Sequence, residues 1–105
     1  MTDKELLELA AKAAGIEIQD ERIWVDAKEG MGGSWEKWNP LTNDGDALRL
    51  AVKLNLAVDI YNSCVCYHSD DLEIEEHYPQ GIIHDMYVAT RRAIVRASAE
   101  IGKSI

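Results

Sequence analysis

Residues 57–78 constrain the fold more than any other part of the sequence. Three short runs, AVDIY (57–61), CVCYH (64–68) and LEIEEHY (72–78), alternate apolar and polar residues as half-buried strands do. Asn62-Ser63 and Asp70-Asp71 separate the runs, and each pair suits a two-residue turn. The sequence therefore predicts an antiparallel meander of three strands.

Two turns of that length would also determine which residues lie opposite each other. Residue 60 would pair with 65, 58 with 67, and 67 with 74. One face would then be apolar and consist of Val58, Ile60, Val65, Tyr67, Leu72 and Ile74. The other face would carry Asp59, Tyr61, Cys64, Cys66, His68, Glu73, Glu75 and His77. A shift of one residue would mix the two sets, so their separation favours this register.

Helix-end signals predict two helices before the meander. Thr2 and Glu5 have the spacing of a capping box, and Gly15 marks the end of the first helix. The second begins after Pro40, because proline disfavours helical angles in the residue before it, and ends near Asn55. Its alternative caps are Thr42, Asn43 and Asp44. We expect an apolar face of Ala47, Leu48, Leu50, Ala51, Val52 and Leu54, with Asp46, Arg49 and Lys53 outside.

A third helix is predicted over residues 85–101, with Gly102 as its stop signal. One broad stripe of small and apolar residues runs along it: Met86, Ala89, Thr90, Ala93, Ile94, Ala97 and Ile101. Val88 and Val95 lie on the opposite side. A helix that is apolar on two sides either lies between two layers or offers one side to a partner, such as a second copy of the chain.

These elements predict a single α+β domain over residues 1–105. We expect an α/β sandwich of three helices and one mostly antiparallel sheet, which holds the 57–78 meander and a further strand near residues 22–26. Three glycines between Gly30 and Ser34 predict a turn, and they lack the spacing of a phosphate-binding loop.

The charge distribution argues against nucleic acid as a partner. The chain has a net charge of −8, and residues 1–83 carry 7 basic and 17 acidic side chains. Such a surface repels phosphates. There is no apolar run of about 18 residues and no apolar leader, so we expect no membrane segment and a cytoplasmic location.

Cys64, Cys66, His68 and His77 are the residues most suited to chemistry. Thiolates and imidazoles bind zinc, although zinc sites usually place paired cysteines two to four residues apart in a turn. On an extended strand the two cysteine side chains would lie about 7 Å apart, too far for a disulfide, so we expect reduced thiols. The acidic surroundings oppose a nucleophilic thiolate. We therefore expect no enzymatic activity and no cofactor.

Two other groups of residues are candidates for partner binding. Trp35 and Trp38 bring large rigid side chains to a loop, where they would form either a binding surface or a lid over the core. Asp70, Asp71 and Glu73 form an acidic hairpin, which is either an ordinary solvated turn or a surface for a nucleic-acid-binding protein.

WNPLTNDGDALRLAVKL (38–54) and ATRRAIVRASAEIGK (89–103) resemble the phage ABA sandwich domain family of small tailed-phage and prophage proteins. A fainter similarity reaches to NinX-type phage proteins. The resemblance implies an α/β sandwich, a phage or prophage origin and expression in the bacterial host, and it implies no catalytic residue or cofactor. The segment CVCYH is not part of it.

We therefore expect a non-enzymatic accessory protein that acts by contact with a host or phage protein in the host cytoplasm. The alternative is a small-molecule or metal-binding protein that uses the sheet face of Cys64, Cys66, His68 and His77.

Overall fold

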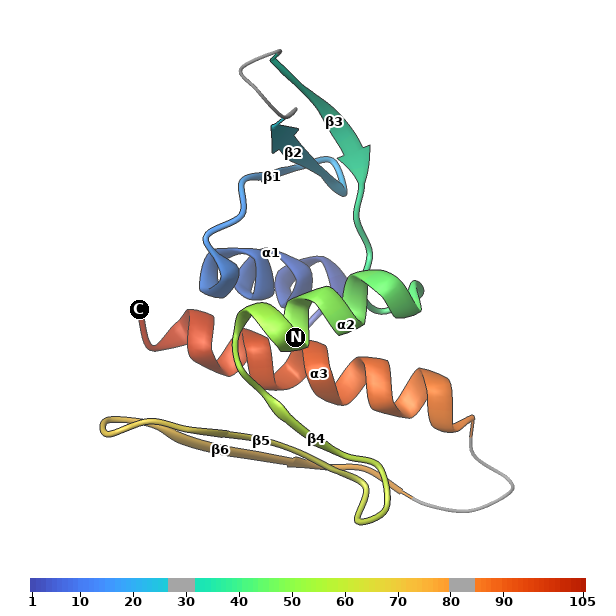
Figure 1. Cartoon of the computed structure of the whole chain (residues 1–105), viewed down its shortest axis with the longest axis vertical. Helices are drawn as coiled ribbons and strands as arrows, with labels where there is room; N and C mark the ends of the chain where they lie inside the picture. Colours follow the sequence, from blue (N-terminus) through green and yellow to red (C-terminus); the bar gives the residue numbers. More distant parts are fainter. Residues whose placement is uncertain (27–31, 80–84) are drawn as a thin grey trace.

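The computed structural model describes residues 1–26, 32–79 and 85–105. Its elements, in chain order, are α1 (Asp3–Ala14), β1 (Ile18–Gln19), β2 (Arg22–Asp26), β3 (Gly33–Lys37), α2 (Asp44–Lys53), β4 (Ala57–Asp59), β5 (Cys64–His68), β6 (Glu73–His77) and α3 (Met86–Lys103). The chain is a single α+β domain with three helices, as predicted (Figure 1). The predicted glycine-rich turn begins outside the described residues, and its last two residues, Gly33 and Ser34, belong to β3.

Helix α3 lies at the centre of the domain. It packs against α1 and α2 on one side and against β5 and β6 on the other (Figure 1). Val95 is fully buried between these layers, while Val88 stays 43% exposed. Of the two alternatives for this helix, the structure has the one in which it lies between layers.

The close approach of α1 and α3 explains a second difference from prediction. Gly102 does not end the helix but lies within it, one residue before the last. A Cβ atom at Gly102 would collide with the backbone carbonyl of Leu9 in α1. The glycine is therefore a contact point between two helices, where a side chain has no room.

The six strands form two sheets, where we predicted one. β4, β5 and β6 form the meander beneath α3, and β1, β2 and β3 form a separate antiparallel sheet on the other side of the helices (Figure 1). β2 is the strand predicted near residues 22–26. It cannot join the meander, because β1 and β3 already occupy both of its edges.

The register of the meander is correct for one hairpin and wrong for the other. β5 and β6 pair as predicted, with Cys64 opposite His77, across a two-residue turn. β4 is shifted by two residues, so that Val58 pairs with Val65. The turn is longer because the Asp59 carboxylate accepts the backbone N–H of Asn62 at 3.0 Å. An even shift preserves the faces of the strand, so Val58 still packs on the core.

The ends of the first two helices agree with the sequence signals. Thr2 caps α1 by accepting the N–H of Glu5, and Gly15 ends it with a left-handed φ of 67°. Among the three candidate caps of α2, Asn43 accepts the N–H of Asp46.

The apolar face of α2 is only partly as predicted. Leu48 and Val52 are 64% and 71% exposed, and Asp46 is buried. The inward position of Asp46 has a structural reason, because its carboxylate bonds the loop before the helix, as discussed below.

Candidate functional site

The β2–β3 hairpin carries a pair of tryptophans at its surface. Trp24 and Trp35 lie directly opposite each other, with ring centroids 5.6 Å apart and ring planes at 70°. Their exposed fractions are 41% and 36%. On the same face Arg22 pairs with Lys37, since side chains two residues apart on a strand point the same way. The face therefore combines two aromatic rings with two basic side chains.

A glycine holds one of these rings in place. A Cβ atom at Gly33 would come within 2.7 Å of a ring carbon of Trp24. The indole of Trp24 thus lies over the backbone of β3, where only a glycine leaves room for it. The aromatic pair is consequently a defined edge-to-face arrangement on the strand surface.

The hairpin stands away from the helices. β2 and β3 pack mainly on each other and on β1, and every residue of β3 is exposed (Figure 1). The radius of gyration is 14.1 Å, against about 13 Å for a compact chain of this length. We call this projecting unit of β2 and β3 the arm.

Trp38, which we also considered for partner binding, differs from Trp35 because it is buried. It is 4% exposed and belongs to the core, which is the lid alternative that the sequence left open. Its backbone N–H donates to the carbonyl of Glu21 at 3.0 Å, and the next residue but one, Pro40, is fully buried. Trp38 thus anchors the base of the arm to the helices.

Trp24 is not among the binding residues predicted from the sequence, although a signal for its pairing with Trp35 exists. Both residues flank the same glycine-rich segment, and alternation along two paired strands would place them on one face. Which residues of β2 and β3 lie opposite each other also depends on the length of the turn between the strands, and residues 27–31 of that turn lie outside the described residues. The sequence therefore places both tryptophans near this turn but does not determine that Trp24 lies opposite Trp35.

The acidic hairpin lies on the other side of the helices from the arm (Figure 1). Asp70 and Asp71 are exposed at a two-residue turn that the backbone bond from Ser69 N–H to the Leu72 carbonyl closes at 2.9 Å. Glu73 lies 3.9 Å from His68 Nδ1 with both side chains exposed. These acids and Trp35 thus belong to separate surfaces.

The outer face of β5 and β6 brings part of the predicted cysteine and histidine group together. The Sγ atoms of Cys64 and Cys66 are 2.9 Å apart, so the expected separation of about 7 Å is wrong for the sulfurs. His77 Nε2 lies 4.0 Å from Cys64 Sγ and 3.4 Å from a carboxylate oxygen of Glu75. Both cysteines are free thiols, as predicted.

The surroundings of Cys64 oppose its ionisation. The hydrogen bond with Cys66, burial, and the nearby charges of Glu75 and Asp59 raise the pKa of the Cys64 thiol to about 11. An anionic sulfur at Cys64 would place a negative charge near two carboxylates and could no longer donate a hydrogen bond to Cys66. Cys66, which is only partly buried, is therefore the more accessible sulfur of the two.

The metal prediction gains no support from this geometry. His68 lies at the far end of β5 beside Glu73, away from the two thiols. Among residues 1–26, 32–79 and 85–105, no three His, Cys, Asp or Glu side chains are arranged to hold a metal ion.

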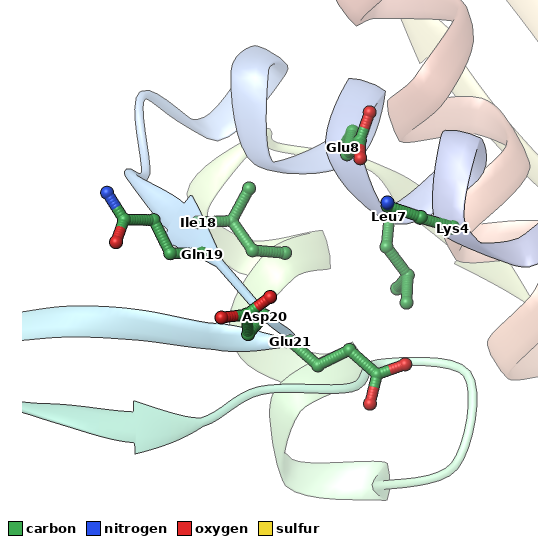
Figure 2. A pocket seen from close by; sticks show the side chains of 7 residues that line it. All are labelled: Lys4, Leu7, Glu8, Ile18, Gln19, Asp20 and Glu21. Atoms are coloured by element: carbon green, nitrogen blue, oxygen red, sulfur yellow. The ribbon is translucent and has the colours of Figure 1, made fainter.

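Several surface depressions were not anticipated. One, of about 660 Å³, lies between α1 and the β1–β2 turn, and Figure 2 shows Leu7 and Ile18 facing it with the acids of the turn at its rim. Asp20 and Glu21 in that turn have left-handed φ angles of 50° and 59°. Another, of about 560 Å³, is mostly apolar and lies between α2, α3 and Ile60. Leu48, which we assigned to the core, forms part of its wall.

None of the helices in the described parts of the chain is long and apolar enough to cross a membrane. No family model, no curated protein and no solved structure matches this chain.

Proposed function

We propose that this chain is a non-enzymatic protein-binding module, and that its partner covers the tryptophan face of the arm. The observation that carries the proposal is the exposed pair of Trp24 and Trp35 on a hairpin that packs loosely on the rest of the domain. The predicted partner surface thereby keeps Trp35, gains Trp24 and loses Trp38.

The energetics of the arm favour this proposal. A small sheet without a covering layer is only marginally stable in water, because its apolar side chains stay in contact with solvent. Tryptophan contributes more binding energy than most residues at protein interfaces, since its large ring loses little conformational freedom when covered. A partner that covers the arm would stabilise it and be held by the same two rings.

The charges near the rings suggest what such a partner looks like. Arg22 and Lys37 flank the tryptophans, on a chain whose net charge is −8. A partner with an apolar socket bordered by carboxylates would match the arm and would suffer less repulsion there than elsewhere on the domain. Asp70, Asp71 and Glu73 remain a second candidate surface, suited to a basic protein.

The resemblance of residues 38–54 and 89–103 to the phage ABA sandwich family supports a wider proposal. The chain would be a phage or prophage accessory protein that binds a host or phage protein in the bacterial cytoplasm. Those two segments supply part of the core and the base of the arm, so the resemblance concerns the scaffold, and the arm would carry the binding.

The test compares capture of bacterial proteins by the wild type, Trp35→Ala and Val52→Ala. Val52 is the matched control, since it is an apolar side chain that is 71% exposed on α2. We expect one bacterial protein that binds wild type and Val52→Ala and is lost with Trp35→Ala, while all three unfold at similar urea concentrations. Equal capture by Trp35→Ala and the wild type would contradict the proposal.

A further inference from the structure

We propose that Cys64 and Cys66 form a redox pair, in which a low-molecular-weight disulfide such as glutathione disulfide oxidises the two thiols to an intramolecular disulfide along β5. The inference does not depend on the proposed function, because it concerns the outer face of the other sheet.

The geometry of β5 holds the two sulfurs ready for bond formation. They are 2.9 Å apart and would have to approach to about 2.05 Å. Two residues along a strand span about 6.7 Å, which lies at the upper end of the Cα separations found in disulfides. Val65, between the two cysteines, is fully buried in the core and keeps this part of the strand in place. The bond can therefore close with a small tightening of one strand.

The different surroundings of the two thiols set the order of the steps. Cys66 is partly exposed, whereas Cys64 is buried and has a pKa raised to about 11. The Cys66 thiolate attacks one sulfur of glutathione disulfide, the bond between the two glutathione sulfurs breaks, and one glutathione thiolate leaves. A mixed disulfide between Cys66 and the second glutathione remains.

Cys64 completes the reaction. Its thiol loses a proton, the sulfur attacks Cys66 Sγ, and the second glutathione leaves as a thiolate that takes up a proton. The protein has then lost two protons and two electrons, and one glutathione disulfide has become two molecules of glutathione. His77 Nε2, at 4.0 Å from Cys64 Sγ, is placed to accept the Cys64 proton in the tautomer that carries its hydrogen on Nδ1, and the imidazolium formed would then donate from Nε2 to the Glu75 carboxylate oxygen 3.4 Å away.

The first test follows the mass of the intact protein during reaction with excess glutathione disulfide, with samples quenched in acid. We expect the wild type to lose the mass of two hydrogen atoms and to end as a monomer without glutathione. Cys64→Ser should stop at one glutathione adduct, and Cys66→Ser should react much more slowly. A wild-type end product that carries glutathione, a disulfide-linked dimer, or equal reaction rates of the two variants would overturn the proposal.

The second test concerns His77. His77→Gln keeps a polar side chain but lacks a base, so the mixed disulfide should accumulate to a higher level than in the wild type. His68→Gln is the matched control, because His68 is an exposed histidine on the same face that lies beside Glu73 instead of the thiols. Ring closure in His77→Gln as fast as in the control would remove His77 from the mechanism, and urea unfolding of both variants checks that each is folded.

Discussion

The carboxylate of Asp46 accepts the backbone N–H of Asn39 at 3.0 Å and so joins the first turn of α2 to the loop before it. Its other oxygen bonds Arg49 at 2.7 Å. The Asn39 side chain accepts the N–H of Leu41 at 3.0 Å within the same loop. These hydrogen bonds fix the conformation of the Trp-Asn-Pro segment, through which the chain leaves the arm and enters α2. They also explain why the acidic side chain of Asp46 is buried at the start of a helix.

Asp46→Ala should destabilise the domain by about 1–3 kcal/mol, because it leaves the partly buried N–H of Asn39 without its acceptor. Urea unfolding at neutral pH measures the change. Asp3→Ala is the control, since Asp3 pairs with Arg92 at an exposed site, where an ion pair contributes about 1 kcal/mol or less. A smaller loss of unfolding free energy for Asp46→Ala than for Asp3→Ala would show that the hydrogen bond between Asp46 and Asn39 does not stabilise the fold.

Gly102→Ala should destabilise the protein although alanine normally favours a helix over glycine. The added methyl group would collide with the Leu9 carbonyl, and overpacking of this kind costs about 1–3 kcal/mol. Gly45→Ala in α2 is the matched control, because its Cβ atom would meet only side-chain atoms at 3.2 Å, among them the flexible end of Arg49. Thermal unfolding of both variants should show a lower midpoint for Gly102→Ala alone.

Gly33→Ala should disturb the tryptophan pair while leaving the core intact. The methyl group would come within 2.5 Å of the Val25 carbonyl oxygen and 2.7 Å of the nearest carbon of the Trp24 ring, so the local backbone and the ring must both shift, which changes the position of the ring relative to Trp35. Coupled indoles contribute a characteristic signal to circular dichroism, and we expect that signal to weaken in Gly33→Ala. Ser34→Ala, one residue further along β3, should retain it.

Cys66→Ala should lower the pKa of Cys64 from about 11 towards its ordinary value of 9.0, because the hydrogen bond with Cys66 is the largest cause of the increase. Thiolate absorbance in the ultraviolet follows the titration. The pH dependence of the protein's stability follows from the same two pKa values. The folded wild type binds the Cys64 proton more tightly than the unfolded chain does. The stabilisation that comes from the protonated Cys64 thiol is therefore complete below pH 9 and is lost as the pH rises through about 11. An unchanged pKa in Cys66→Ala would contradict the assigned cause.

The sequence by itself determined the parts of the fold that depend on near neighbours. The caps at Thr2 and Asn43 act over three residues, and the pairing of Cys64 with His77 follows from a two-residue turn. Alternation along the strands predicted that Val58, Val65 and Ile74 share the core face of the meander, whereas Ile60, which we placed on the same face, is 62% exposed. Each of these features arises from bonds and angles that a short segment can satisfy alone.

Only the tertiary structure decided what covers each element. Trp38 and Trp35 are three residues apart and chemically alike, yet one lies against the helices and the other on the arm. Val95 is buried because a sheet and a helix layer enclose α3, and β2 lies outside the meander because β1 and β3 occupy its edges. The separation of the Cys64 and Cys66 sulfurs depends on side-chain rotamers as well as on the strand. Burial is set by contacts between distant segments, and periodicity along one segment does not specify those contacts.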